Sequence, residues 1–306
     1  MSATPDPLLA REGLWTRLWR RPRARWCLLV LGVYLLAALW GELRYLQGRL
    51  SGETPFYNQV NTEQRYLPPV GFRRGMTRSA AAPRYWLGTD NLGRDVGARL
   101  VQGTRIAFRV GVVTSAIAIP LGVLLGCLGG YFGGKLDAWV LWLCATVSAM
   151  PGILFVLAIA MVMGKGLLGL YVGIGFTTWV GVCRVVRAEV LKHRDRPYIE
   201  AARLLGYGHA RVLFRHLLPN VMHVVLIALS LRFPAAVGSE VFISFLGIGV
   251  QHEPSWGVMI ANARLRLWQG MWWEMTFVTL AIFCLVLCAN LLADELRDLL
   301  DPTLRL

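Results

Sequence analysis

Long apolar stretches alternate with short polar segments along most of this 306-residue chain. A helix needs about 20 apolar residues to cross a bilayer. The pattern therefore predicts an all-α polytopic membrane protein with six transmembrane helices. The stretches that predict these helices are residues 26–41, 110–134, 138–164, 166–183, 217–251 and 275–293.

Three of these stretches predict irregular helices. The first is short for a membrane span, so we expect its helix to continue to residue 46. The stretch 138–164 contains Pro151, where we expect a bend. The stretch 217–251 is long for one helix, and the Gly- and Pro-rich sequence at its end predicts a turn or partial re-entry before residues 254–272.

The boundaries of the stretches also predict how the chain is divided. Basic residues precede the first stretch and no small-residue cleavage site follows it, so we expect a retained helix and a cytoplasmic N-terminus. Six crossings then place the C-terminus in the cytoplasm as well. The predicted segments are a cytoplasmic stretch at 1–25, a first span at 26–46, an extracytoplasmic stretch at 47–105, a five-helix core at 106–294 with a cytoplasmic loop at 190–219, and a cytoplasmic tail at 295–306.

The distribution of basic residues supports this orientation in one segment and opposes it in another. Segment 184–216, predicted inside, carries eight Lys and Arg residues against three acidic ones, as the positive-inside rule expects. Segment 43–105, predicted outside, carries ten Arg residues against four acidic ones. Loops longer than about 60 residues escape the rule, so we keep the predicted orientation.

Composition narrows the class of partner. Charged residues make up 16% of the chain, whereas soluble domains carry about 25%. The net charge of +14 comes from Arg residues between apolar stretches, which favours anionic lipid headgroups and not nucleic acid as the partner. The six cysteines form no C-x-x-C pair, and we expect them to be small buried apolar residues without disulfides.

The polar sequence EAARLLGYGHARVLFRHLLPN lies between two apolar stretches. Asp195 and Pro197 predict the start of a short helix, because Asp caps free amides and Pro suits a first helical turn. Gly206 predicts its end, which gives a helix over 197–205 and a second helix from near His209.

The first of these helices offers a small-residue face. Ala201 and Ala202 have short side chains, so a helix that carries them can enter a groove on another protein. Glu200 lies beside that face as a charged anchor. The alternative is an amphipathic cytoplasmic loop without a docking role.

The pattern E-A-A-x3-G, followed by L-P, resembles the cytoplasmic loop of membrane subunits of bacterial ABC importers. Its R-H-x-L-P-N ending is nearer to the peptide and nickel branch, and His216 stands where the general family usually has Ile. The resemblance implies that the helix pair docks into a cleft of an ATPase subunit and moves when ATP closes the ATPase dimer. The matching positions are Glu200, Ala201, Ala202, Gly206, Leu218 and Pro219.

Two further blocks resemble the same branch. Residues 239–257 resemble its segment E-x-x-x-S-F-L-G-x-G-x-x-x-x-P-S-W-G, and residues 86–111 resemble its segment G-T-D-x-x-G-R-D-x-x-x-R. The alternating Asp and Arg residues predict salt-bridged turns and no metal site, because hard cations gather more oxygen ligands. Residues 43–85 match no block. The matched positions of the earlier block are Gly88, Thr89, Asp90, Gly93, Arg94, Asp95 and Arg99.

Small and charged residues inside the predicted spans are further candidates. Gly122, Gly126 and Gly130 recur every four residues and predict a seam for close helix packing, within this subunit or against a partner subunit. Charges inside spans are functional candidates by default, and Arg232 and Glu240 are eight residues apart. Arg232 either faces the pathway and meets a carboxylate of the cargo, or pairs with Glu240 or with an acid of the partner. We favour the pairing.

Two apparent motifs do not hold. The sequence GGYFGGK (residues 129–135) has the pattern G-x-x-x-x-G-K but ends an apolar stretch and is followed by Leu136 where a P-loop has Ser or Thr, so we expect no ATP site there. Three histidines recur every seven residues but straddle Pro219, so we expect no metal site. They are His209, His216 and His223.

The resemblance implies the second, C-type permease subunit of a dipeptide, oligopeptide or nickel ABC importer, with a type I permease core. The implied partners are a homologous permease, two ATPases that use ATP and Mg, a periplasmic or lipid-anchored binding protein, and membrane lipids. No catalytic residue and no cofactor of its own are expected. Peptides are the predicted cargo, with nickel or another small solute as the alternative. A secondary transporter fits less well, because we find no internal repeat.

Overall fold

The computed structural model describes residues 14–52, 54–72, 85–251 and 253–300. The fold is all-α, as predicted, and the described residues contain no β-strand beyond a single bridge between Thr89 and Asp95. The ends of the predicted N-terminal and C-terminal segments, 1–13 and 301–306, lie outside the described residues. The long helices are α2 (Pro22–Ser51), α3 (Val96–Phe132), α6 (Leu167–Arg194), α9 (Leu218–Phe245) and α11 (Trp273–Leu300).

Shorter helices connect or flank these five. α4 (Gly134–Ser148) and α5 (Gly152–Met163) together are apolar enough to cross a membrane but meet at an angle of 85°. Pro151 lies at this break. The helix is interrupted there because proline lacks an amide hydrogen and keeps the preceding residue out of the helical conformation. The bend predicted at Pro151 is thus a sharp corner. Counting the pair as one bent span gives the six predicted crossings.

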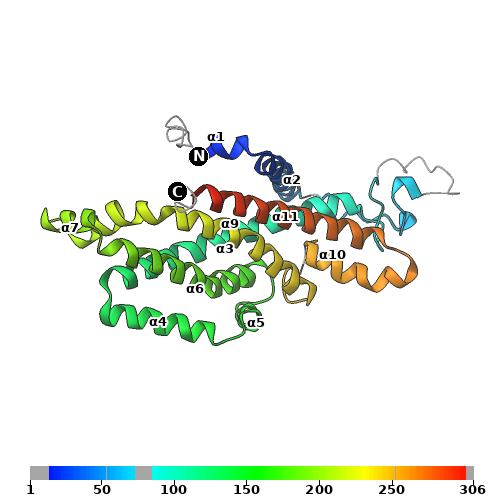
Figure 1. The fold of residues 1–306 in the computed structure, drawn as a ribbon. Coiled ribbons are helices and arrows are strands. Elements are labelled where there is room, and N and C mark those ends of the chain that lie inside the picture. The colour runs from blue at the N-terminus through cyan, green and yellow to red at the C-terminus, as the bar shows by residue number, and fades with distance from the viewer. Residues whose placement is uncertain (1–13, 53, 73–84, 252, 301–306) are drawn as a thin grey trace.

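The remaining elements lie at the two ends of the bundle (Figure 1). The Gly- and Pro-rich sequence at the end of α9 forms a turn before α10, which is the first of the two alternatives predicted for the segment before residues 254–272. The elements are α1 (Leu14–Arg20), η2 (Thr62–Gln64), η3 (Val70–Phe72), α7 (Pro197–Leu204), α8 (His209–Arg211), the π-helical turn η5 (Val212–Leu217), α10 (Trp256–Ala263) and η6 (Arg264–Gln269).

Several helices extend beyond the apolar stretches that predict them. α3 begins at Val96 and not near residue 110, so it takes in the last part of the segment predicted to be extracytoplasmic. Its first turns carry Arg99, Gln102 and Arg105, which are all buried. The start of the uncharged stretch therefore does not mark the start of α3, because the charged side chains in the first turns of α3 are enclosed by residues from other elements.

α3 lies at the centre of the bundle and packs along α6 through the glycine seam of Gly122, Gly126 and Gly130. A Cβ at Gly122 would lie 2.6 Å from Cβ of Val182, and one at Gly126 would lie 2.7 Å from the carbonyl oxygen of Cys183. Of the two alternatives that the sequence leaves open, the structure shows packing within this chain. The seam is occupied by α6 and is not free for a partner subunit.

The two ends of the described chain meet at one end of the bundle. Nη1 of Arg21, between α1 and α2, donates to Oε2 of Glu295 in α11 over 2.6 Å. Figure 1 shows α1 and the end of α11 side by side, on the same side of the bundle as α7. The opposite end carries α10 and the segment 85–95.

Candidate functional site

The short helix α7 begins at Pro197 and ends at Leu204, close to the predicted bounds. Gly206 follows with φ of +76°, and the amide of Tyr207 donates to the carbonyl of Ala202, which closes the helix end. Glycine suits this position because the left-handed conformation strains other residues. The predicted cap by Asp195 is wrong: Arg196 occupies the cap position without a side-chain hydrogen bond.

One face of α7 is buried within the chain itself. Ile199 and Ala202 lie in an apolar cluster formed by side chains from α3, α6, η5 and α9. Only 4% of Ala202 is exposed, so the prediction that it belongs to a free small-residue face is wrong. Ala201 and Glu200 are exposed, and these two remain available to a partner.

The exposed face of this region is larger and more apolar than the sequence predicts. Leu204 is 89% exposed, Leu205 is 72% exposed and Phe214 is 57% exposed. We call Glu200, Ala201, Leu204, Leu205 and Phe214 the docking face. The sequence does indicate this face. Ile199 and Ala202 are three residues apart and so lie on one side of α7, which leaves the adjacent leucines on the other side.

The remaining predicted loop residues lie where the docking face joins the bundle. The ring of His216 stacks on Tyr207, with centroids 5.6 Å apart and planes at 18°. Leu218 is half-buried against the cluster beneath α7, and Pro219 is exposed in the first turn of α9. α8 and η5 run directly into α9, so the loop is continuous with a long span.

Side chains also connect this loop to the end of α3. The hydroxyl of Tyr131 lies 3.0 Å from Nδ1 of His209, and the guanidinium of Arg203 lies 5.1 Å from the centre of the Tyr131 ring. Tyr131 is itself buried. A displacement of the docking face would therefore act on α3, α6 and α9 together.

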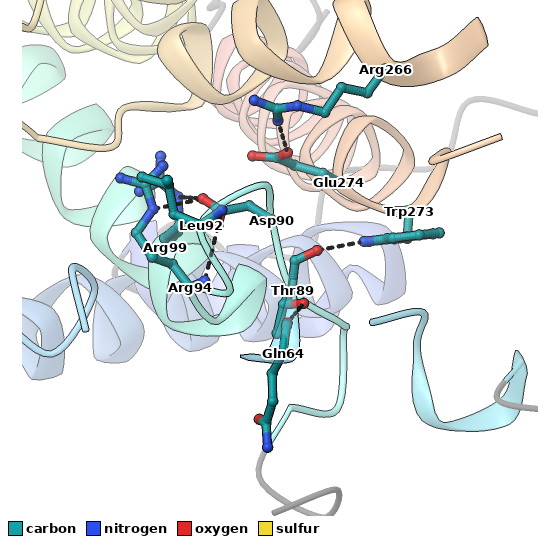
Figure 2. A network of polar contacts seen from close by, with 9 residues as sticks. All are labelled: Gln64, Thr89, Asp90, Leu92, Arg94, Arg99, Arg266, Trp273 and Glu274. Atoms are coloured by element: carbon teal, nitrogen blue, oxygen red, sulfur yellow. Dashed lines mark hydrogen bonds and ion pairs between the residues drawn. The ribbon is translucent and has the colours of Figure 1, made fainter. Parts of the chain in front are cut away.

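The opposite end of the bundle contains the Asp- and Arg-rich block (Figure 2). Oδ1 of Asp90 accepts the amide hydrogens of Leu92 and Arg94 over 2.9 Å, and its Oδ2 pairs with Nε of Arg94 over 2.7 Å. Nε of Arg99 lies 3.6 Å from the same carboxylate. Asp95 caps α3 by accepting the amide hydrogen of Gly97. These contacts form the salt-bridged turn that the sequence predicts.

The same turn is anchored to distant parts of the chain. Oγ1 of Thr89 donates to the carbonyl of Gln64 over 2.6 Å, and the indole of Trp273 donates to the carbonyl of Thr89 over 3.0 Å. Nearby, Arg266 pairs with Glu274 over 3.4 Å. Figure 2 shows that these residues come from η2, the turn before α3, η6 and α11, and that the side chain of Gln64 points away from the others.

A second polar cluster lies at this end of the bundle, and it is not predicted from the sequence. Arg105 is 1% exposed and pairs through Nε with Glu42 and through Nη1 with Glu253, both over 2.6 Å. Nε2 of Gln102 also donates to Glu253 over 2.6 Å. The guanidinium further lies 3.7 Å from the centre of the Tyr45 ring. This cluster joins α2, α3 and the connection between α9 and α10.

The block at residues 239–257 forms the corner between α9 and α10. Oγ of Ser244 donates to Oε1 of Glu240 over 2.7 Å and accepts the amide hydrogen of Val250 over 3.2 Å. A Cβ at Gly257 would collide with the backbone of Val241, so only glycine fits the crossing. The indole of Trp256 donates to the carbonyl of Leu100 in α3. The block therefore serves to fix α10 against the bundle.

Arg232 and Glu240 do not pair, so the first half of the interpretation that we favoured is wrong, while pairing of Arg232 with an acid of the partner stays a prediction. Glu240 is 1% exposed and bonds Ser244 in the corner below α10. Arg232 faces a cavity between α3, α6 and α9. Eight residues turn a helix by about 80° beyond two full turns, so the two side chains point to different faces.

Comparison with known proteins places this geometry in a family. Residues 118–306 match the family described as binding-protein-dependent transport system inner membrane component. A dipeptide transport system permease protein, DppC of Bacillus subtilis (strain 168), is 36% identical over 236 residues, covering 76% of this chain and 74% of that protein. A glutathione transport system permease protein, GsiD of Pectobacterium atrosepticum, is 36% identical and covers 72% of this chain and 73% of its own length.

A solved structure supports the fold. A chain of the MetNI methionine ABC transporter, in an inward-facing conformation, superposes with a TM-score of 0.53 at 18% identity. The superposition covers 74% of this chain and all of that one. At this level of identity the likeness concerns the arrangement of helices.

Proposed function

This chain belongs to the family of binding-protein-dependent transport system inner membrane components, and from that premise we propose that it is a permease subunit that imports peptides across the inner membrane. Relatives named for dipeptide and glutathione transport align over more than 70% of the chain. Nickel is the weaker alternative, because neither of these two relatives is named for it.

The observation that carries the proposal is the docking face. It is apolar and exposed, yet the opposite side of the same helix is packed against α3, α6 and α9. An exposed apolar patch of this kind marks an interaction site. We assign it to an ATPase subunit, which puts the α7 end of the bundle in the cytoplasm and the α10 end outside.

The mechanism that follows is alternating access. ATP binding and hydrolysis in two partner ATPases would displace the docking face, and α9, continuous with it, would carry the displacement into the membrane. A homologous second permease would complete the pathway, and a periplasmic or lipid-anchored binding protein would deliver cargo. ATP and Mg are handled by the ATPases, and this chain contributes no catalytic group. Cargo and ATP must favour different states for the cycle to be directional.

Purification of the tagged chain from its native membrane in mild detergent, followed by mass spectrometry, tests the assembly. We expect a second permease and P-loop ATPases with the native chain, and recovery of the ATPases at least about tenfold lower with Leu204→Glu, because a charge replaces a docked apolar side chain. Leu50→Glu is the matched control, since Leu50 is 88% exposed at the opposite end of the bundle.

The cargo is tested by uptake of radiolabelled dipeptides into cells that lack the chain and carry it on a plasmid, with labelled nickel measured in parallel. Peptide uptake that depends on the chain supports the proposal. Nickel uptake alone would replace the cargo assignment. A stable homo-oligomer without ATPases would leave a secondary transporter as the better reading.

A further inference from the structure

A small open cavity lies between α3, α6 and α9. Its polar lining consists of Thr114, Ser115, Thr178, Arg232 and Ser239, and the rest is aliphatic. Each lining segment is near the middle of its helix: Arg232, for example, is in the central turn of α9, which runs from Leu218 to Phe245. The cavity therefore lies far from both ends of the bundle, at the depth where transporters bind their substrates.

Arg232 has no counter-ion in this cavity. Among the residues that the structure describes, no carboxylate pairs with it and no hydrogen bond is formed by its guanidinium. Its guanidinium lies against Gly181 of α6, where a Cβ would collide with it. α6 thus leaves room for the charged group. A cation inside a span is costly unless it is paired, so this position requires a partner that the described chain does not supply.

The hydroxyl groups around the cavity add a second observation. Thr114, Thr178 and Ser239 donate to backbone carbonyls of their own helices, over 2.7, 2.7 and 2.9 Å. Ser115 is 5% exposed, and its Oγ is buried without a hydrogen-bond partner. Buried polar groups are nearly always satisfied. The cavity therefore holds one unused hydroxyl donor beside one unpaired cation, and both suit an anion.

We propose that Arg232 and Ser115 form a carboxylate-binding site in the middle of the pathway, which receives the C-terminal carboxylate of a peptide during transport. This deepens the proposed function and rests on it for the identity of the cargo. A guanidinium binds a carboxylate through charge-assisted hydrogen bonds, which are about twice as strong as neutral ones. The carboxylate would supply the counter-ion that Arg232 lacks.

The charge preference of the cavity can be measured without any assumption about cargo. Ser239→Cys places a thiol in the cavity of the purified complex, which is then reacted with an anionic and a cationic methanethiosulfonate of similar size. We expect the anionic-to-cationic rate ratio to fall about tenfold when Arg232→Gln is added, as expected for loss of a nearby charge at intermediate dielectric. Gly238→Cys is the matched position on the same helix, because it does not line the cavity and nothing lies within 4 Å of it.

An unchanged ratio would overturn the proposal, because it would mean that Arg232 is already neutralised by an acid of the partner permease. An equal fall of the ratio at position 238 would also overturn it, because the change would then not depend on the cavity that Arg232 lines.

Uptake provides the second measurement. We expect Arg232→Gln to reduce dipeptide uptake at least about tenfold, in line with loss of a charge-assisted contact, and Arg232→Lys to restore part of it. Recovery of the ATPases should be equal for both variants. Undiminished uptake by Arg232→Gln would overturn the carboxylate site and leave peptide import standing. Absence of peptide uptake by the native complex would refute peptide import, while the thiol ratio would still decide whether the cavity binds anions.

Discussion

The charged cluster at the α10 end and the docking face at the α7 end are held in place by different kinds of interaction. At the α10 end, buried charges join separate elements: Arg105 alone connects α2, α3 and the chain before α10. At the α7 end, an apolar cluster and ring contacts hold the docking face. Paired buried charges require defined geometry, whereas apolar surfaces tolerate small shifts. We infer that the α10 end is the rigid frame and that the α7 end is the part that moves.

The largest expected effect comes from the frame. Arg105→Met removes the buried cation that Glu42 and Glu253 share, and breaking a buried ion pair in this way costs about 3–5 kcal/mol. We expect a large fall in the melting temperature of the purified complex, measured by tryptophan fluorescence. Arg109→Gln is the control: Arg109 pairs with Glu42 over 3.2 Å but is 44% exposed, so its loss should cost no more than about 1 kcal/mol. Equal effects would mean that burial does not set the strength of these pairs.

Two neighbouring alanines test the moving end. Ala202→Arg forces a charge into the cluster beneath α7 and should cost on the order of 3 kcal/mol locally. Ala201→Arg changes only the exposed face. Hydrogen exchange of residues 197–217 should rise for the first variant alone, while recovery of the ATPases should fall for both. Unchanged exchange in Ala202→Arg would show that α7 is not held by the cluster.

The glycine seam is the point at which the moving end joins the frame. Gly126→Ala brings a Cβ to 2.7 Å from the carbonyl oxygen of Cys183 and 3.1 Å from the amide nitrogen of Arg187. Overpacking against backbone costs about 1–3 kcal/mol, and it should lower the melting temperature and slow transport. Gly32→Ala in α2 is the control, because nothing lies within 4 Å of that position. A neutral result for Gly126→Ala would mean that α3 and α6 separate easily.

The sequence predicts the positions of spans, corners and helix ends well, because these depend on the residue type at one position or in one stretch. Apolar stretches locate the spans, and Pro151 and Gly206 mark a corner and a helix end. It fails where the outcome depends on partners far along the chain. Nothing local shows that Arg105 will be enclosed by Glu42 and Glu253, which lie 63 and 148 residues away.

The same limit applies to the candidate site. The motif locates the loop at residues 190–219, but it cannot show which side of α7 the bundle covers, so Ala202 was assigned to the wrong face. The spacing of eight residues between Arg232 and Glu240 was taken as two full helical turns, which would put both side chains on one face. The additional rotation of about 80° puts them on different faces. The unpaired state of Arg232 depends on three helices that meet only in the fold.

The smallest expected effect tests the link between α3 and the docking face. Tyr131→Phe removes only the hydroxyl 3.0 Å from His209 and leaves the ring under Arg203. Loss of such a hydrogen bond costs about 0.5–1.5 kcal/mol, so uptake should fall modestly while binding-protein-stimulated ATP hydrolysis continues. Tyr198→Phe removes a similar contact to His193 at 2.9 Å on an exposed side chain and should have no effect. If Tyr131→Phe instead lowered the melting temperature as much as Arg105→Met, the α7 end would be as rigidly held as the frame. Motion would then have to enter the membrane through the bundle as a whole and not through its α7 end.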